Sequence, residues 1–337
     1  MATAAAALPQ RSRSARISRR LQPYMYLLPA FAVMAIITFY PLVFQVWMSF
    51  HDFGQINFRV RNPVPAEFVG LDNYVRIATS KLQIPNFEFV RLVLFNLFWA
   101  FSNVVVHVII GVFVAVILNT KGLWFKGMYR ALFILPVVIP SIIVATVWRN
   151  MFDPQSGAVN LGLQGLGGLF GISPDHPAFN LDWIRQPSDP ISWIPLPLAF
   201  FAMITTNTWL GWPLNAVVAT GALQSIPGEL YEAAEIDGAG WWQKFRNVTA
   251  VYLRPAMLPY AIYGFVVTFN LFFLPFFMTQ GEPFGRTELL VTQAWRLAYD
   301  RRLFGVAAAF CVYLFFLLLI VTLVTNRMAK ATKSYAD

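Results

Sequence analysis

Long stretches without a single Asp, Glu, Lys or Arg are the feature that most constrains this chain. A transmembrane helix needs about 20 consecutive, mainly apolar residues. Six stretches meet that need, and Tyr129 and Trp148 flank the third at positions typical of membrane interfaces. The sequence therefore predicts an all-α integral membrane protein with six transmembrane helices. We expect these helices near residues 23–50, 92–119, 128–151, 194–223, 253–280 and 303–327.

Composition supports a membrane protein over a soluble one. Of the 337 residues, 58% are apolar and 12% are charged, whereas a soluble domain carries roughly 25% charged residues. The formal charge of +9 does not indicate nucleic acid, because the basic residues lie between apolar stretches and form no patch with aromatic residues. They are typical of charges that orient membrane helices in lipid. The single cysteine, Cys311, permits no internal disulfide.

A seventh uncharged stretch, residues 154–174, is not expected to span the membrane. It contains six glycines and several polar residues, so it would insert poorly into lipid. Its residues Val159, Leu163, Leu166 and Phe170 recur at helical spacing. The stretch therefore predicts a short amphipathic helix at the surface.

The basic N-terminus sets the expected orientation. Five arginines precede the first apolar stretch and should remain in the cytoplasm, and this stretch is too long for a cleaved signal peptide. Six crossings return the C-terminus to the same side. We thus expect a cytoplasmic segment over residues 1–22, a transmembrane domain over 23–327 and a cytoplasmic tail over 328–337, with the loop 225–250 also in the cytoplasm.

The loop 225–250 predicts two short helices joined by a sharp turn. Ser225 is a suitable N-cap, Pro227 suits the first helical turn, and Gly238 can adopt the left-handed conformation that ends a helix. Ala233 and Ala234 add almost no bulk, so another surface could approach this helix closely. The second helix should have one apolar face, because apolar residues recur in it at helical spacing: Trp241, Trp242, Phe245 and Val248.

This loop resembles the EAA loop of ABC importer permeases. Glu232-Ala233-Ala234 is followed by Gly238 after three residues, and Leu253 and Pro255 match the end of the family pattern. Arg254 replaces the usual leucine before this proline. The resemblance implies a coupling helix that docks in a groove of a separate ATPase subunit and transmits its closure to the membrane. The residues it implies for this contact are Glu232, Ala233, Ala234, Asp237 and Gly238.

Three further segments, residues 48–50, 68–74 and 221–227, are similar to the carbohydrate-uptake branch, in particular to one subunit type of maltose and multiple-sugar permeases. The resemblance implies half of a translocation pathway for a mono-, di- or oligosaccharide. It also implies as partners a second homologous permease subunit, two ATP-binding cassette subunits and an extracytoplasmic solute-binding protein. The expected location is the cytoplasmic membrane of a bacterium or archaeon.

Motifs for catalysis and cofactor binding are absent from the sequence. No G-x-x-x-x-G-K-[ST] loop is present, so ATP and Mg²⁺ are expected on the partner ATPase and no cofactor on this chain. Three scattered histidines form no metal-ligand set. One of them, His107, lies within a predicted span, where it could be a functional group or an interhelical hydrogen-bond partner.

Sugars are bound by aromatic faces and by amide or hydroxyl groups, and such residues gather in two predicted spans. Polar side chains within a span should face protein or a water-filled path. The candidates for substrate contact are Trp209, Asn215, Thr268, Asn270 and Phe273. Trp209 for stacking and Asn270 for hydrogen bonding form the preferred pair. Related permeases often carry a second amide where this chain has phenylalanine, and all five residues could instead bridge helices.

Two functions from other classes compete with the importer permease. A stand-alone channel or secondary transporter would commonly show internal repeats and charges at mid-membrane depth, which the six stretches lack. A membrane enzyme would need a catalytic cluster at one interface, and the sequence contains none. Co-purification with an ATPase would distinguish the permease from both.

Overall fold

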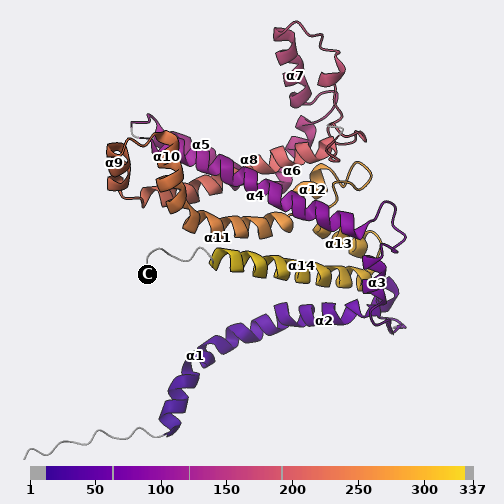
Figure 1. The fold of residues 1–337 in the computed structure, drawn as a ribbon. Helices are drawn as coiled ribbons and strands as arrows, with labels where there is room; N and C mark the ends of the chain where they lie inside the picture. Colours follow the sequence, from indigo (N-terminus) through magenta and orange to yellow (C-terminus); the bar gives the residue numbers. More distant parts are fainter. Residues whose placement is uncertain (1–12, 63, 121, 191–192, 331–337) are drawn as a thin grey trace, which may run out of the picture.

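Helices make up most of the computed structural model, which describes residues 13–62, 64–120, 122–190 and 193–330. Within these ranges one small sheet occurs, in which β1 (His51–Asp52) pairs antiparallel with β2 (Glu67–Phe68). The long helices lie side by side, so that the molecule is an elongated bundle with two distinct ends (Figure 1). Those helices are α4 (Phe89–Asn119), α8 (Leu198–Gln224), α11 (Ala250–Phe269) and α14 (Phe304–Lys330).

The helices α4 and α8 form the centre of the bundle and pack closely through two glycines. A Cβ atom at Gly211 would overlap the imidazole of His107, and one at Gly111 would overlap Asn215. Each helix thus places a polar side chain against a glycine of the other, as small residues allow at helix interfaces in membranes. This interlocking contact holds α4 and α8 together.

Four helices have the length and apolarity of membrane spans, and they correspond to the first, second, fifth and sixth predicted helices. They comprise Tyr24–Ser49, Phe89–Asn119, Trp241–Met278 and Phe304–Arg327. The helix α8 has a comparable length of 27 residues, but its Thr and Asn residues make it less apolar. It was predicted as the fourth span, and its polar side chains are largely buried among its neighbours.

The third predicted helix, 128–151, is divided into two helices, so its prediction as one continuous helix was wrong. Two helices, α5 (Lys126–Val138) and α6 (Ser141–Met151), meet at an angle of 95°. Pro140 lies between them and cannot donate a backbone hydrogen bond, while Ile139 before it is extended, with φ −81° and ψ 128°. The two helices could form a single bent span.

The N-terminal helix extends away from the bundle. It runs through α1 (Arg13–Met34), a π-helical turn at Ala35–Phe39 and α2 (Tyr40–Ser49), and it begins earlier than the predicted residue 23. Of this helix, α2 packs on α14 (Figure 1), and none of the most apolar window of Tyr24–Ser49 is buried. Of the predicted cytoplasmic segments 1–22 and 328–337, residues 1–12 and 331–337 lie outside the described residues.

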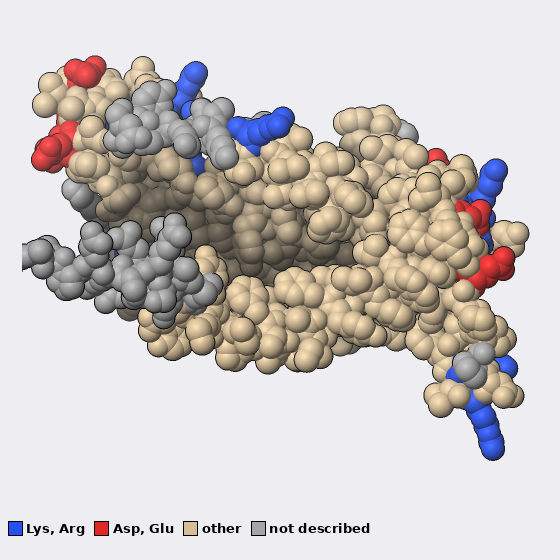
Figure 2. Space-filling model, turned by 90° about the horizontal axis from the view of Figure 1, so that it is seen from below, with Lys and Arg blue, Asp and Glu red and all other residues tan. Residues whose placement is uncertain are grey.

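The two ends of the bundle carry the shorter elements. One end has α9 (Gly228–Ile236) and α10 (Trp241–Lys244), and the other has α3 (Asp72–Ala78), α12 (Phe273–Met278) and α13 (Leu290–Tyr299). Charged side chains lie at these two ends, and an uncharged band separates them (Figure 2). Such a band matches the hydrocarbon layer of a membrane.

One helix and the chain that follows it project sideways from the bundle (Figure 1). They contain α7 (Ala158–Leu169) and a 3₁₀ turn at Pro177–Phe179, so the short helix predicted within 154–174 is present. The predicted apolar face is divided, however. Val159 is partly buried in a core of the bundle, whereas Leu166 and Phe170 are exposed. The polar residue Asn160 is buried as well, and its amide donates to the carbonyl of Leu181 in the returning chain.

Candidate functional site

The loop 225–250 forms the pair of helices that the sequence predicts, at one end of the bundle. The first helix, α9, begins at Gly228 after Pro227, whose backbone is in the N-cap position. The prediction of Ser225 as the N-cap was wrong. Ser225 ends α8 instead, and its hydroxyl donates to the carbonyl of Ala222 at 2.8 Å. The chain therefore passes from α8 to α9 with almost no connecting loop.

The turn between the two helices depends on Gly238. Its φ of +74° lies in the left-handed region, which a residue with a Cβ atom adopts only at a cost. The amide of Ala239 donates to the carbonyl of Ala234 at 2.8 Å and closes the end of α9. Gly240 then begins α10, and its amide donates to Oε1 of Gln243 at 2.8 Å.

The second helix of the pair continues directly into the bundle. From α10 the chain passes through a π-helical turn at Phe245–Thr249 into α11. The sequence separated this helix from the span expected to start at residue 253, whereas the structure joins α10 to α11 in one continuous helix that ends at Phe269. A displacement of the α9–α10 pair, which we call the end hairpin, would therefore act directly on α11.

The inner face of the end hairpin is packed against the bundle. The hydroxyls of Tyr231 and Thr249 lie 2.9 Å apart and join α9 to the π-helical turn. Leu230 and Tyr231 also contact a buried cluster from α4, α8 and α11, which contains Ala115, Ala219, Leu223, Ile226, Leu253 and Met257. The hairpin is thus fixed to three bundle helices at once.

The outer face of the end hairpin is uncovered. Glu232 and Ala233 are exposed, Ile236 is 87% exposed and Trp241 is 66% exposed. Glu235 forms an ion pair with Lys244 at 2.8 Å across the two helices. A narrow helix with two alanines, flanked by acidic and apolar side chains, offers a surface on which another protein could pack closely. The predicted residues Glu232, Ala233, Ala234, Asp237 and Gly238 all lie on this hairpin.

Two of the predicted substrate-contacting residues are buried within the bundle. Asn215 donates to the carbonyl of Gly211 at 3.0 Å within α8, and Thr268 is 5% exposed. A third residue, Trp209, is partly buried and lies against Trp148 of α6, with 6.1 Å between ring centroids. Asn215 and Thr268 are thus buried in this conformation, and their role stays a prediction.

The other two predicted residues are exposed at the break between α11 and α12. Asn270 ends α11, and its amide donates to the carbonyl of Val266 in the same helix, at 2.9 Å. Phe273 is 50% exposed. The preferred pair, Trp209 and Asn270, lies on different helices, and the described contacts include none between them. Their role in substrate binding stays a prediction.

A buried polar network between helices was not identified from the sequence. The amide of Asn207 on α8 donates to Oδ1 of Asn103 on α4 at 2.8 Å. Asn96 on α4 donates to the carbonyl of Phe269 at 3.2 Å and accepts from the amide of Leu290 at 2.8 Å. The sequence did contain one signal for this network. Asn96 and Asn103 are seven residues apart, so both lie on the same face of one helix. Nε2 of His107 has no hydrogen-bond partner among the described residues.

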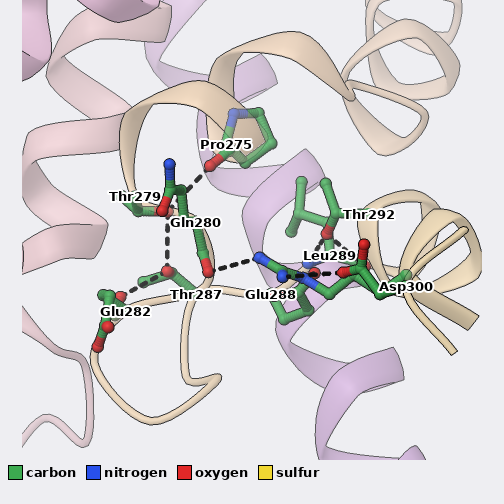
Figure 3. A network of polar contacts seen from close by, with 10 residues as sticks. Pro275, Thr279, Gln280, Glu282, Thr287, Glu288, Leu289, Thr292 and Asp300 are labelled. Carbon is green, nitrogen blue, oxygen red and sulfur yellow. Dashed lines mark hydrogen bonds and ion pairs between the residues drawn. The ribbon is translucent and has the colours of Figure 1, made fainter.

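The opposite end of the bundle contains a second network, which was also not identified from the sequence (Figure 3). Arg296 on α13 donates to Glu288 at 3.0 Å and to the carbonyl of Gln280 at 2.7 Å, and its other nitrogen lies 3.5 Å from Asp300. Thr287 links the same loop to Thr279 at 3.0 Å. These contacts fix the loop between α12 and α13. No group of three or more potential metal ligands occurs in the described part of the chain.

The chain matches a known protein family and known structures. Residues 107–333 match the model of the binding-protein-dependent transport system inner membrane component. A bacterial ABC transporter involved in the import of the acidic polysaccharide alginate has a chain with the same fold, at a TM-score of 0.73 and 19% identity. The alignment covers 96% of this chain and 100% of that one.

Curated bacterial proteins are similar over most of this chain. The galactooligosaccharides transport system permease protein GanP of Bacillus subtilis is 29% identical over 93% of this chain and 71% of its own length. The maltodextrin permease protein MdxF of the same organism is 28% identical, over 92% and 69%. For the maltose/maltodextrin permease protein MalF of Salmonella typhimurium the identity is 33%, over 77% of this chain and 49% of that protein. The family match covers well over half of the chain, which therefore belongs to the family of binding-protein-dependent transport system inner membrane components, the membrane permease subunits of ABC importers.

Proposed function

We propose that this chain forms half of the translocation pathway of a sugar importer and couples it to ATP hydrolysis by a separate ATPase subunit. The similarity to permeases named for galactooligosaccharides, maltodextrin and maltose supports a sugar as the substrate. A mono-, di- or oligosaccharide fits the proposal equally. The chain itself carries out no catalytic step, and ATP and Mg²⁺ bind to the partner.

The end hairpin is the observation that carries the proposal. Its inner face is fixed to α4, α8 and α11, whereas Glu232 and Ala233 on its outer face are uncovered. Because α10 continues into α11, a force on α9 would reach the middle of the bundle through one helix. ATP binding must favour one state by several kcal/mol to shift the conformational population decisively, and such a shift needs a connection that does not bend easily.

The proposed topology has six crossings, with α5–α6 as one bent span and α8 as a buried span. The C-terminal end of α14 and the N-terminal end of α1 both lie at the same end of the molecule as the end hairpin (Figure 1). This arrangement supports a cytoplasmic location for the hairpin and both termini. The proposed assembly contains a second permease subunit, two ATP-binding cassette subunits and an extracytoplasmic solute-binding protein, in a bacterial or archaeal cytoplasmic membrane.

Cysteine labelling tests the topology. Gln243 is exposed on α10, so Gln243→Cys should react with an impermeant maleimide only after the cells are permeabilised. Glu282→Cys, in the exposed part of the loop at the opposite end, should react in intact cells and serves as the control. Labelling of Gln243→Cys from outside would reverse the orientation.

Charge reversal at the hairpin tests coupling. Glu232→Lys should abolish most sugar uptake and substrate-stimulated ATP hydrolysis together, because Glu232 is exposed on α9 and would meet the ATPase surface. Glu282→Lys places the same change at the opposite end and should leave basal ATP hydrolysis unaffected. A disulfide from Ala233→Cys to a cysteine in the ATPase groove would demonstrate the contact directly. Normal uptake with Glu232→Lys would remove the hairpin as the coupling element.

The substrate path is tested at Asn270 and Trp209. Asn270 is the exposed candidate, and its amide bonds within its own helix, so Asn270→Leu should lower sugar uptake while assembly and basal ATP hydrolysis persist. Loss of one amide partner to a sugar corresponds to about 1–3 kcal/mol. Trp209→Ala should act likewise through lost stacking. Unchanged uptake kinetics in both variants would place the path elsewhere.

Co-purification tests the alternative of a stand-alone channel or secondary transporter. The importer should be recovered from membranes with an ATPase and a second permease subunit. Recovery of this chain alone, together with sugar transport by the purified chain without ATP, would establish the alternative.

A further inference from the structure

A groove runs along the surface of α8 near the end hairpin. It has a volume of about 350 Å³, which lies at the lower end of the range for small-molecule sites, about 300–1,000 Å³. Its walls come from α4, α5 and α8, and most of them are apolar. The lining comprises Leu118, Arg130, Phe133, Ile134, Pro213, Ala216, Val217, Thr220, Gly221 and Gln224.

The groove has one polar end. The helix α5 begins and α8 ends on the same side of the bundle, so Arg130, Thr220 and Gln224 lie towards that side. Ile134 and Pro213, further along the two helices, lie towards the middle of the bundle. Arg130 is the only charged residue of the lining, and its guanidinium forms no ion pair with any described residue.

Exposed aromatic residues mark the membrane interface at the polar end. Trp124 is 81% exposed and Phe125 is 68% exposed, just before α5, and Tyr129 is also exposed. Tryptophan and tyrosine gather where a membrane meets water. Arg130 follows Tyr129 directly, so its long side chain can reach the headgroup level while its stem lies along the groove.

We propose that this groove binds an anionic phospholipid, with an acyl chain along α8 between Pro213 and Gln224 and the phosphate at Arg130. Charge complementarity favours this occupant, because the cytoplasmic leaflet is anionic and basic pockets between helices on that side bind such headgroups. The proposal takes only the orientation of the bundle from the proposed function.

The apolar lining of the groove favours a lipid chain. A flexible acyl chain can lie along the walls from α4, α5 and α8, and it leaves no backbone groups to satisfy. A sugar would need more polar partners than Arg130, Thr220 and Gln224 offer along an otherwise apolar wall.

Lipid retention by the whole transporter tests the proposal. The complex is purified from membranes and exchanged into a mixture of dioleoyl-phosphatidylglycerol and dioleoyl-phosphatidylcholine, and the retained lipid is counted by native mass spectrometry. The unmodified complex should retain phosphatidylglycerol over phosphatidylcholine. Arg130→Gln should lower the retained phosphatidylglycerol about fivefold, the factor that one basic side chain near an anionic surface supplies.

A second variant fills the groove without removing charge. A Cβ added at Gly221 would have no neighbouring atom within 4 Å, so Gly221→Leu can be accommodated and should lower retention of both lipids. Gly127→Leu is the matched control, since Gly127 also has free space but does not line the groove. Arg254→Gln controls for the loss of a basic residue outside the groove.

Three results would overturn the proposal. The first is equal phosphatidylglycerol retention with and without Arg130. The second is displacement of the lipid by millimolar inorganic phosphate, which would indicate a bare anion site. The third is loss of the second permease subunit in Gly221→Leu, which would assign the groove to the subunit interface. None of these readouts depends on sugar transport, so failure of the proposed function would be seen separately.

Discussion

The two ends of the bundle differ in how far their charged side chains are exposed. At the end hairpin, Glu232 is exposed, and the ion pair of Lys244 with Glu235 has a glutamate side chain that is 64% exposed. At the other end, Glu288 is only 9% exposed in its side chain, and Arg296 bonds to it and to the carbonyl of Gln280 (Figure 3).

This difference separates residues that hold the fold from residues available to a partner. Buried polar groups in a folded protein nearly always have hydrogen-bond partners within it, as Glu288 and Arg296 have. Side chains that remain exposed around an otherwise well-packed hairpin add little to the stability of the chain alone. The comparison therefore predicts that substitutions at the two ends will divide between loss of stability and loss of coupling.

The largest expected loss of stability follows removal of the buried carboxylate. Glu288→Ala leaves Arg296 without its closest anion, and breaking a buried pair costs about 3–5 kcal/mol. Because the side chain of Arg296 is 29% exposed, we expect a smaller loss of about 2–3 kcal/mol. Thermal unfolding of the purified protein measures the effect. Glu288→Gln keeps an acceptor for Arg296 and should lose less. An unfolding temperature equal to that of the unmodified protein would show that the network does not hold this end.

The contact between α4 and α8 lies between the two ends of the bundle. Overpacking it should give the next largest loss of stability. Gly211→Ala would place its Cβ against the imidazole of His107, and overpacking of this kind costs about 1–3 kcal/mol. The double variant Gly211→Ala/His107→Ala should regain part of that loss, because the two sites are directly coupled.

Gly264→Ala is the matched control for this contact. Gly264 lies within α11, and a Cβ there would have only an ordinary contact with Val104, at 3.8 Å. Its unfolding temperature should not fall. If His107→Ala fails to improve the stability of Gly211→Ala, the close approach of the two helices does not depend on this histidine.

A change at the hairpin turn should affect coupling more than stability. Gly238→Val forces a branched residue into a left-handed conformation, with φ at +74°, at a cost of about 1–2 kcal/mol. The protein should still insert, while uptake and substrate-stimulated ATP hydrolysis fall together. Gly240→Val is the control, since its φ of −68° accepts any residue. Full activity of Gly238→Val would show that the turn geometry is not needed for coupling.

The sequence predicted the features that depend on local pattern. Apolar stretches indicated the long helices, and the positive φ of Gly238 was predicted from its position after α9. The bend between α5 and α6 was missed even though Pro140 lies at the junction, because prolines also occur within intact helices of this chain, such as Pro213 in α8. Whether a proline bends a helix depends on the helices packed around it.

Long-range contacts were beyond the reach of a single sequence. The bonds of Asn96 to Phe269 and Leu290 join residues 173 and 194 positions apart, and no periodicity relates them. For the same reason Asn215 and Thr268 looked like Asn270 in the sequence, although the structure buries the first two and exposes the third. Residue type identified polar positions within the helices, whereas packing decided which of them could meet a ligand.

The smallest expected loss of stability concerns the ion pair within the end hairpin. Lys244→Ala removes the ion pair with Glu235, which is 2.8 Å long but largely open to water on the glutamate side. Such surface pairs contribute about 0–1 kcal/mol to stability. Salt at about 1 M shortens the screening length to about 3 Å, so it should remove most of the difference in stability between the variant and the unmodified protein. Thermal unfolding at low and high salt measures both quantities. A loss as large as that of Glu288→Ala, or one that salt leaves unchanged, would mean that the hairpin holds the fold as firmly as the opposite end does.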